Sequence, residues 1–181
     1  MTPSEERALI ARVLEGNRLA ARQLYDAHAP RVYRLVFRLV RDETLAEEFT
    51  QDAFVKVFGG LGTFRGEARL STWIHRVAVM ETLSGLRRQK RRDTRELSLE
   101  FAAEAEMPSR GIEPDLADQL YRAIDGLPEA FRVPLVLHDI EGFTHAEIAK
   151  MTGSPEGTCK TRLMNARAKV RAVLVAFGAR P

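Results

Sequence analysis

The chain has little of what disulfide scaffolds, membrane proteins and β-sheets require. Its 181 residues include one cysteine, Cys159, which excludes an intramolecular disulfide and is typical of a reducing cytoplasm. No run approaches the roughly 18 consecutive apolar residues of a membrane-spanning helix, and the N-terminal residues lack the pattern of a signal peptide. No stretch alternates apolar and polar residues between hairpin turns. These absences favour a cytoplasmic, all-α protein with no membrane span.

A recognisable catalytic or cofactor constellation is also missing. The chain has no glycine-rich phosphate loop and no nucleophile motif. The four histidines are scattered, and together with the single cysteine they do not have the spacing of zinc ligands; they are His28, His75, His138 and His145. We therefore expect no metal, no cofactor and no catalysis by this chain alone.

Positive charge is present, in two separate blocks. Residues 1–92 carry 17 Lys and Arg against 11 Asp and Glu, and residues 142–181 carry seven against two. Between them, residues 93–141 carry four against 12. Either basic block alone is explained by solvated helix faces, but two blocks on one chain favour two contacts with a polyanion.

Apolar periodicity and helix-capping residues predict two small helical domains. We expect helices over about 3–15, 18–28, 30–41, 43–58 and 69–91, then over about 114–125 and 128–140, with Pro134 kinking the latter. Residues 93–113 are acidic and lose the helical pattern, which indicates a linker. The expected domains are residues 1–92 and 114–181.

Residues 144–171 have the pattern of a helix-turn-helix. Thr144 and Glu147 form a capping box, residues 152–153 end the first helix, and Ser154 and Pro155 start the second. We expect an inward-facing stripe that makes Cys159 a small buried apolar residue rather than a nucleophile; the stripe consists of Cys159, Leu163, Ala166 and Val170. The second helix of such a motif enters the major groove of DNA.

Three segments, residues 28–58, 64–92 and 127–169, together resemble an extracytoplasmic-function sigma factor of bacterial RNA polymerase. These read HAPRVYRLVFRLVRDETLAEEFTQDAFVKVF, FRGEARLSTWIHRVAVMETLSGLRRQKRR and LPEAFRVPLVLHDIEGFTHAEIAKMTGSPEGTCKTRLMNARAK. Such factors have conserved regions 2 and 4 joined by a linker. The resemblance implies an all-α initiation factor whose partners are core RNA polymerase, promoter DNA and an anti-sigma protein.

The resemblance assigns core-polymerase docking to the helix over residues 43–58. An apolar stripe of Leu45, Phe49, Ala53 and Val57 faces inward there, which leaves an acidic face accessible. The pattern alone is also that of an ordinary amphipathic helix. The expected docking residues are Glu47, Glu48, Gln51, Asp52 and Lys56.

Residues 64–92 interleave aromatic and cationic side chains, His75 among them, as the capture of unstacked bases requires. In the resembled family this segment melts and reads the downstream (−10) promoter element. Trp73 has the spacing of a core residue, and we favour that interpretation over a base platform. The expected contact residues are Phe64, Arg65, Arg69, Trp73, Arg76, Met80, Arg87 and Arg88.

The last helix is expected to read the upstream (−35) element as duplex. The family often has Arg where this chain has Asn165, and asparagine pairs with adenine where arginine favours guanine or phosphate. This predicts an upstream element that differs from the common one. The expected contact residues are Thr158, Lys160, Thr161, Arg162, Met164, Asn165 and Arg167.

Two further departures lie on the long helix. The family usually has Asn at the place of Met80 and Asp at that of Ser84, so the recognised sequence or the efficiency of melting is expected to differ. A degenerate factor that binds core enzyme but initiates poorly is therefore one alternative. A helix-turn-helix regulator that binds duplex DNA without joining polymerase is the other main alternative, and an enzyme is a remote third.

Overall fold

The computed structural model describes residues 2–96 and 116–176, and every regular element over these residues is helical. The chain divides into two compact units, Met1–Arg87 and Arg88–Pro181. The predicted all-α, two-domain fold class is therefore confirmed. Over the described residues, no helix is both long and apolar enough to cross a membrane.

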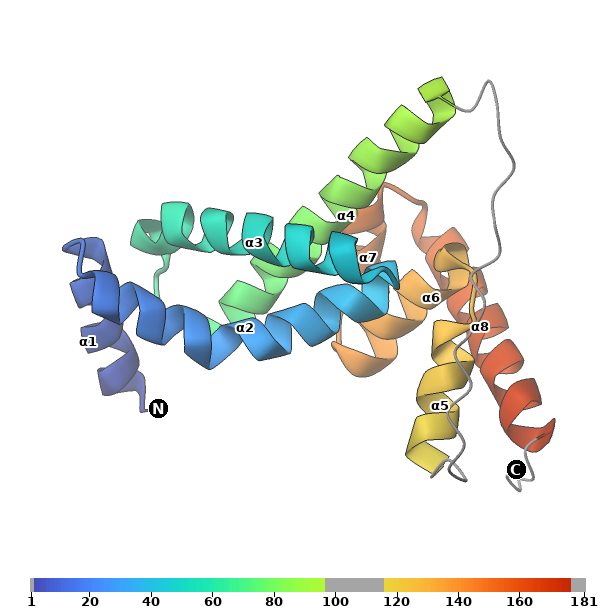
Figure 1. The fold of residues 1–181 in the computed structure, drawn as a ribbon. Helices are drawn as coiled ribbons and strands as arrows, with labels where there is room; N and C mark the ends of the chain where they lie inside the picture. Colours follow the sequence, from blue (N-terminus) through green and yellow to red (C-terminus); the bar gives the residue numbers. More distant parts are fainter. Residues whose placement is uncertain (1, 97–115, 177–181) are drawn as a thin grey trace. The chain divides into compact units, whose positions relative to one another are not determined.

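The N-terminal unit is built around a pair of adjacent helices. Figure 1 shows α2 and α3 side by side, joined by a short turn at Arg41 and Asp42. Arg41 ends α2 in the left-handed conformation, with φ of 60°. The elements are α1 (Pro3–Leu14), α2 (Arg18–Val40), α3 (Glu43–Gly60), the 3₁₀ turn η1 (Leu61–Thr63) and α4 (Leu70–Glu96).

Side-chain caps begin these helices where the sequence predicted. Thr2 and Glu5 form a reciprocal capping box at α1. The Asn17 side chain accepts a hydrogen bond from the Ala20 N–H at 3.0 Å, and the Asp42 carboxylate accepts one from the Leu45 N–H at 2.8 Å. Each cap satisfies an N–H that has no partner inside its helix.

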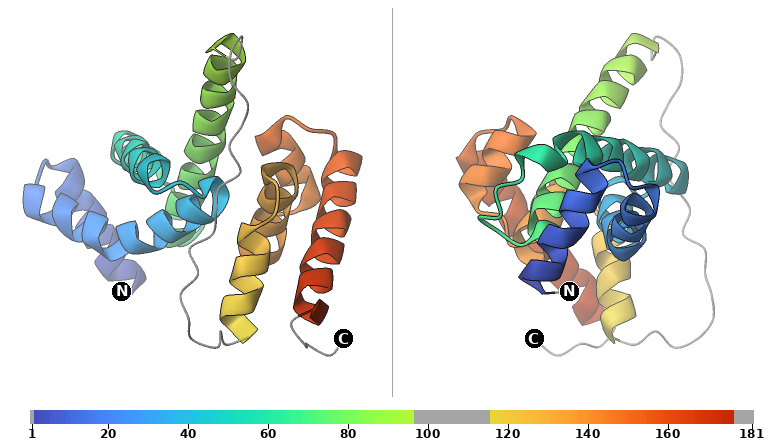
Figure 2. Two further views of the ribbon diagram at one scale, coloured as in Figure 1. Left: turned by 45° about the vertical axis from the view of Figure 1, so that its right-hand side comes forward. Right: turned by 90° about the vertical axis from the view of Figure 1, so that its left-hand side faces the viewer.

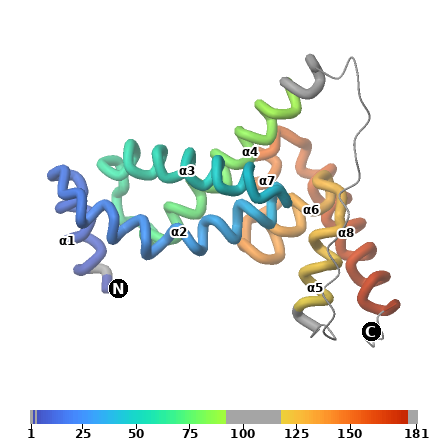
Figure 3. Tube along the Cα trace, in the orientation of Figure 1, coloured from blue at the N-terminus to red at the C-terminus, as the bar shows by residue number. Residues whose placement is uncertain are grey.

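The prediction of two helices meeting at Pro30 is wrong, because α2 runs without interruption from Arg18 to Val40 (Figure 3). An interior proline costs about 3 kcal/mol relative to alanine. Its φ is nevertheless helical, and only one intrahelical hydrogen bond is lost. The fully buried Leu24, Val32 and Leu35 flank Pro30 and hold both halves against the same core.

The predicted inward stripe of α3 forms the centre of that core. Phe49, Ala53 and Val57 are each at most 3% exposed, while Leu45 is half-buried. On α4, Gly85 lies against Phe49: a side-chain carbon built at Gly85 would be only 2.6 Å from two atoms of the Phe49 ring. The absence of a side chain at Gly85 therefore allows α4 to approach α3 closely.

The long helix α4 extends five residues past the predicted end at residue 91. Residues 93–96, expected in the linker, are therefore helical. The rest of the predicted linker, residues 97–113, lies outside the described residues.

The C-terminal unit contains α5 (Leu116–Asp125), α6 (Glu129–Leu135), the π-helical turn η2 (Val136–Ile140), α7 (His145–Thr152) and α8 (Glu156–Ala176). In both views of Figure 2, α5 lies beside α8. Pro134 lies in α6, where the sequence predicted a kink, and the backbone after it widens into η2, with the Glu141 N–H donating to the Val136 carbonyl at 3.0 Å.

The helix-turn-helix is formed by α7 and α8. Thr144 and Glu147 make the predicted capping box, and Gly153 ends α7 in the left-handed conformation, with φ of 68°. The predicted inward face of α8 is confirmed, since Cys159, Leu163, Ala166 and Val170 are all buried.

Candidate nucleic-acid and protein interfaces

The outer face of α3 is acidic and accessible. Glu47, Glu48, Gln51 and Lys56 are exposed, and Asp52 is half-buried. Glu47 and Gln51 also line a groove of about 370 Å³ between α2 and α3, whose opposite wall includes Tyr25, Pro30 and Tyr33. The structure therefore brings the predicted α3 residues together on one surface beside a groove that the sequence did not reveal.

An aromatic pair lies at the loop between α3 and α4. The rings of Phe64 and Trp73 are tilted by 53°, with centroids 5.6 Å apart, and both residues are half-buried. Gly60 underlies Trp73: a side-chain carbon built there would lie 3.5 Å from the indole. Trp73 is thus packed on one side while retaining exposed surface.

Cationic side chains lie in the loop before α4 and along that helix. Arg65 forms a long ion pair with Glu67, 3.9 Å between Nη1 and Oε1, and both side chains are largely exposed. Along α4, Met80 is 59% exposed, whereas Ser84 is half-buried. The remaining predicted cations, Arg69, Arg76, Arg87 and Arg88, are exposed.

His75 does not belong to this surface, although the sequence grouped it with the cations. Its side chain is 9% exposed and lies in the interior of the N-terminal unit. His28 of α2 interacts electrostatically with His75. Burial lowers the pKa of His28, the Glu6 carboxylate opposes this shift, and the electrostatic interactions with His75 and Arg31 lower the pKa further.

The outer face of α8 presents the residues expected near its start. Met164 is 64% exposed, Asn165 and Thr161 are exposed, and Thr158 is half-buried. The Thr161 hydroxyl donates to the Gly157 carbonyl at 3.0 Å. Two cations are engaged within the unit: Lys160 Nζ lies 2.7 Å from Glu156 Oε1, and Arg162 Nη1 lies 3.4 Å from Ser154 Oγ.

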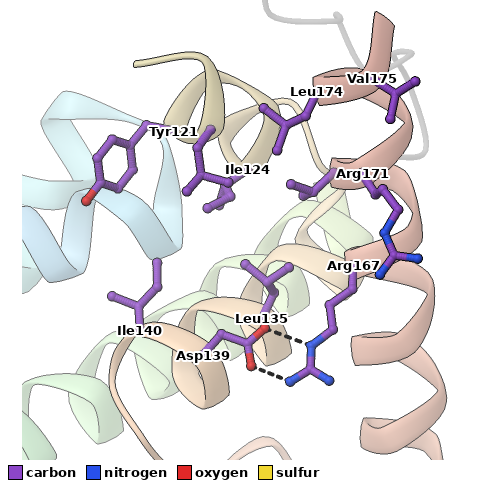
Figure 4. Close-up of a pocket in the computed structure, with 11 residues that line it drawn as sticks. Tyr121, Ile124, Leu135, Asp139, Ile140, Arg167, Arg171, Leu174 and Val175 are labelled. Carbon is purple, nitrogen blue, oxygen red and sulfur yellow. Dashed lines mark hydrogen bonds and ion pairs between the residues drawn. The ribbon is translucent and has the colours of Figure 1, made fainter. Parts of the chain in front are cut away.

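Arg167 of α8 is held by a carboxylate from another element. Its guanidinium donates two hydrogen bonds to Asp139 of η2, at 2.9 Å from Nε to Oδ2 and 2.6 Å from Nη2 to Oδ1 (Figure 4). The hydrogen bonds from Arg167, and then that with His138, lower the pKa of the Asp139 carboxyl group. No pattern in the sequence predicts this contact, because the partners are 28 residues apart.

The same region contains a pair of histidine rings. His138 and His145 stack with centroids 4.4 Å apart and 25° between the ring planes. Burial lowers the pKa of His145, and the electrostatic interactions with His138, Lys160 and Arg167 lower it further, while the Glu156 carboxylate opposes the shift. Within residues 2–96 and 116–176, no three His, Cys, Asp or Glu side chains are placed to hold a metal ion.

An apolar groove of about 440 Å³ is lined by residues of α5, α6, η2 and α8 (Figure 4). Ile124 and Leu135 line this groove together with Arg167 and Arg171. Tyr121 at 42% and Val175 at 49% are among its exposed residues. Sequence reasoning missed this groove, whose only signal was the apolar residues near the ends of α5 and α8.

Comparison with known families matches both units. Residues 24–92 match the family described as Sigma-70 region 2, and residues 117–170 match that described as Sigma-70, region 4. The chain is 33% identical to the ECF RNA polymerase sigma factor SigM of Mycobacterium tuberculosis, over 92% of this chain and 83% of that protein. It is 30% identical to the ECF RNA polymerase sigma-E factor of Escherichia coli, over 90% of each chain.

Solved structures show the same fold. The sigma factor RpoE of Bartonella quintana, crystallised with the anti-sigma factor NepR, aligns with a TM-score of 0.60 at 22% identity, over 84% of this chain and 95% of its own. CnrH, solved with the cytosolic domain of CnrY, aligns with a TM-score of 0.53 at 24% identity, over 94% and 97%.

Proposed function

Because this chain belongs to the extracytoplasmic-function family of RNA polymerase sigma factors, we propose that its two helical units divide promoter recognition between them. The protein is an initiation factor that binds core RNA polymerase and directs it to promoters. We assign docking and downstream-element melting to residues 1–92, spacing to residues 93–113, and upstream-element binding to residues 114–181. Polymerase performs the chemistry in the cytoplasm, and this chain supplies specificity rather than catalysis.

The presence of both regions in one chain carries this proposal. A duplex-DNA regulator that never joins polymerase accounts for α7 and α8, but it leaves the match over residues 24–92 unexplained. Two weak contacts joined by a linker also bind cooperatively through their effective concentration. The proposal that the chain is a sigma factor therefore accounts for both basic blocks of the sequence.

Docking is assigned to the acidic face of α3. Ala46, Phe49 and Ala53 anchor the helix in the core, so Glu47, Glu48 and Gln51 are presented outward on a rigid element. Such a face steers association with a basic partner surface and selects against acidic ones. Asp52 and Lys56 complete the proposed contact.

Melting is assigned to the Phe64–Trp73 pair and to the cations of the preceding loop and of α4. Half-exposed aromatic rings stack on unpaired bases of any sequence, and arginines hold the backbone of the displaced strand. Met80 is exposed on the same helix, where it contacts the downstream element in place of the family's usual asparagine. Arg65, Arg69, Arg76, Arg87 and Arg88 are the proposed backbone contacts.

Upstream-element binding is assigned to the first half of α8. Thr158, Thr161, Met164 and Asn165 are the proposed base-edge contacts, with Lys160 and Arg162 on phosphates. A bidentate contact from Asn165 selects adenine.

An anti-sigma protein is the proposed regulatory partner. The solved structures of RpoE and CnrH were determined in complex with NepR and CnrY, respectively. In this chain, the apolar groove between α5 and α8 offers surface that such a protein would cover.

A titration of the labelled chain with purified bacterial core RNA polymerase tests the proposal. Saturable binding is expected at nanomolar to micromolar concentrations, roughly −8 to −12 kcal/mol. Gln51→Ala and Glu48→Arg are each expected to weaken it, the charge reversal by roughly tenfold. Glu15→Arg reverses an exposed charge beyond the end of α1 and serves as the matched control. Failure of the folded wild-type chain to bind core enzyme would refute the proposal.

A further inference from the structure

The π-helical turn η2 contacts both helices of the helix-turn-helix through two consecutive side chains. Asp139 accepts the two hydrogen bonds from Arg167 of α8, and His138 stacks on His145, the first residue of α7. His138 Nδ1 also lies 2.8 Å from Asp139 Oδ1, the oxygen that accepts from Arg167 Nη2. One turn of backbone thus connects to α7 and α8 through a continuous set of side-chain contacts.

The direction of these two side chains follows from the irregular backbone before them. Pro134 has no N–H to donate in α6, and after Leu135 the helix widens to π geometry over the five residues Val136–Ile140. A π turn holds more residues than an α turn, so the side chains in it point in directions that a regular helix would not give them. His138 and Asp139 both lie inside this turn.

The Arg167 pair differs from the other ion pair of α8. Lys160 and Glu156 are four residues apart on one helix, so their contact places no constraint on a second element. Asp139 and Arg167 join elements 28 residues apart with two charge-assisted hydrogen bonds in fork geometry. Breaking this pair removes two hydrogen bonds that hold α8 against η2.

We propose that Asp139 and Arg167 are a positioning pair that sets the orientation of the recognition helix, and that Arg167 adds no net charge to the DNA backbone contact. This inference rests on the duplex-binding role assigned to α8 above, and it revises the role that the sequence predicted for Arg167. Salt-dependent DNA affinity counts cations that neutralise phosphates. The Arg167 charge is already opposed by a carboxylate at 2.6–2.9 Å.

Fluorescence anisotropy of the full chain on a labelled random-sequence duplex, measured at several salt concentrations, tests the pair. Arg167→Met combined with Asp139→Asn removes both charges of the pair, and this double variant is expected to lower the affinity by roughly 2- to 5-fold at every salt concentration, with the slope of log affinity against log salt unchanged. Arg167→Lys keeps the pair neutral and is expected to behave like the double variant, because lysine cannot make the two parallel hydrogen bonds. Asp139→Asn leaves the arginine charge unopposed, so the slope of log affinity against log salt concentration is expected to steepen by about 0.9 in this variant.

Arg162→Met is the reference variant, because Arg162 is a proposed phosphate contact and has a hydroxyl rather than a carboxylate as its partner. It is expected to make the slope shallower by about 0.9. Far-UV circular dichroism establishes that each variant is folded, and the lysine variant keeps the charge should the double variant unfold.

Two outcomes would overturn the inference and point to different causes. A shallower slope in the double variant together with wild-type affinity in Arg167→Lys would make Arg167 a phosphate contact, leaving the sigma function intact. A wild-type chain that fails to bind the duplex at low salt would instead remove the duplex-binding role on which the pair depends.

Discussion

Gly85→Ala should destabilise the N-terminal unit even though alanine is the better helix former. A β-carbon at residue 85 would lie 2.6 Å from two atoms of the Phe49 ring and 3.0 Å from a third. Phe49 is 3% exposed and therefore has little room to withdraw. Overpacking a core costs about 1–3 kcal/mol, and replacing a helical glycine by alanine returns about 1 kcal/mol. The expected net loss in free energy of unfolding is about 1 kcal/mol.

The assay is urea denaturation followed by tryptophan fluorescence. The chain has one tryptophan, Trp73, so the signal reports on the N-terminal unit alone. Gly59→Ala is the control, because a β-carbon there meets no atom within 4 Å. That variant should be neutral or more stable by up to about 1 kcal/mol.

A double-mutant cycle with Phe49→Leu separates the clash from other effects of the alanine. In the Phe49→Leu background the ring is absent, so Gly85→Ala should become stabilising by up to about 1 kcal/mol. The reasoning is refuted if Gly85→Ala is stabilising in the wild-type background, or if its effect is the same in both backgrounds.

Three further predictions concern pH and promoter choice. Burial lowers the pKa of His28, so neutral His28 is favoured in the folded state. Its contribution to the free energy of unfolding should be fully present above the ordinary histidine pKa of about 6.5 and should be lost as the pH falls through the lower pKa of the folded state. The urea midpoint of the wild type should therefore decline with falling pH more steeply than that of His28→Gln. Met80→Asn with Ser84→Asp should increase opening of a linear promoter, measured by permanganate reactivity, and unchanged opening would show that these positions do not limit melting. Asn165→Arg should shift one selected upstream position from adenine toward guanine in a random-duplex selection, and an unchanged preference would remove Asn165 from the reading face.

The local signals in the sequence predicted most of the helix starts correctly. Thr2, Asn17, Asp42 and Thr144 cap helices through groups three residues away, so the information lies within one turn of chain. The burial of Cys159 followed in the same way, from the 3.6-residue period of α8. The order of conserved regions 2 and 4 could also be predicted from the sequence, because it depends only on the order and spacing of motifs along the chain.

Helix continuity was decided by packing rather than by local preference. Pro30 favours a break locally, yet buried residues on both sides of it outweigh that preference in α2. His75 is a second example. The sequence grouped it with the cationic side chains and so suggested a surface position, but the packing of α4 places it in the interior.

The functional surfaces show this division most clearly. The sequence by itself determined the family, the helical class and the side chains available on α3, α4 and α8, because each depends on spacing within a segment. Only the tertiary structure decided that Arg167 is held by Asp139 and that α5 and α8 enclose an apolar groove. Both depend on contacts between residues far apart in the chain, and those contacts form only when the helices pack.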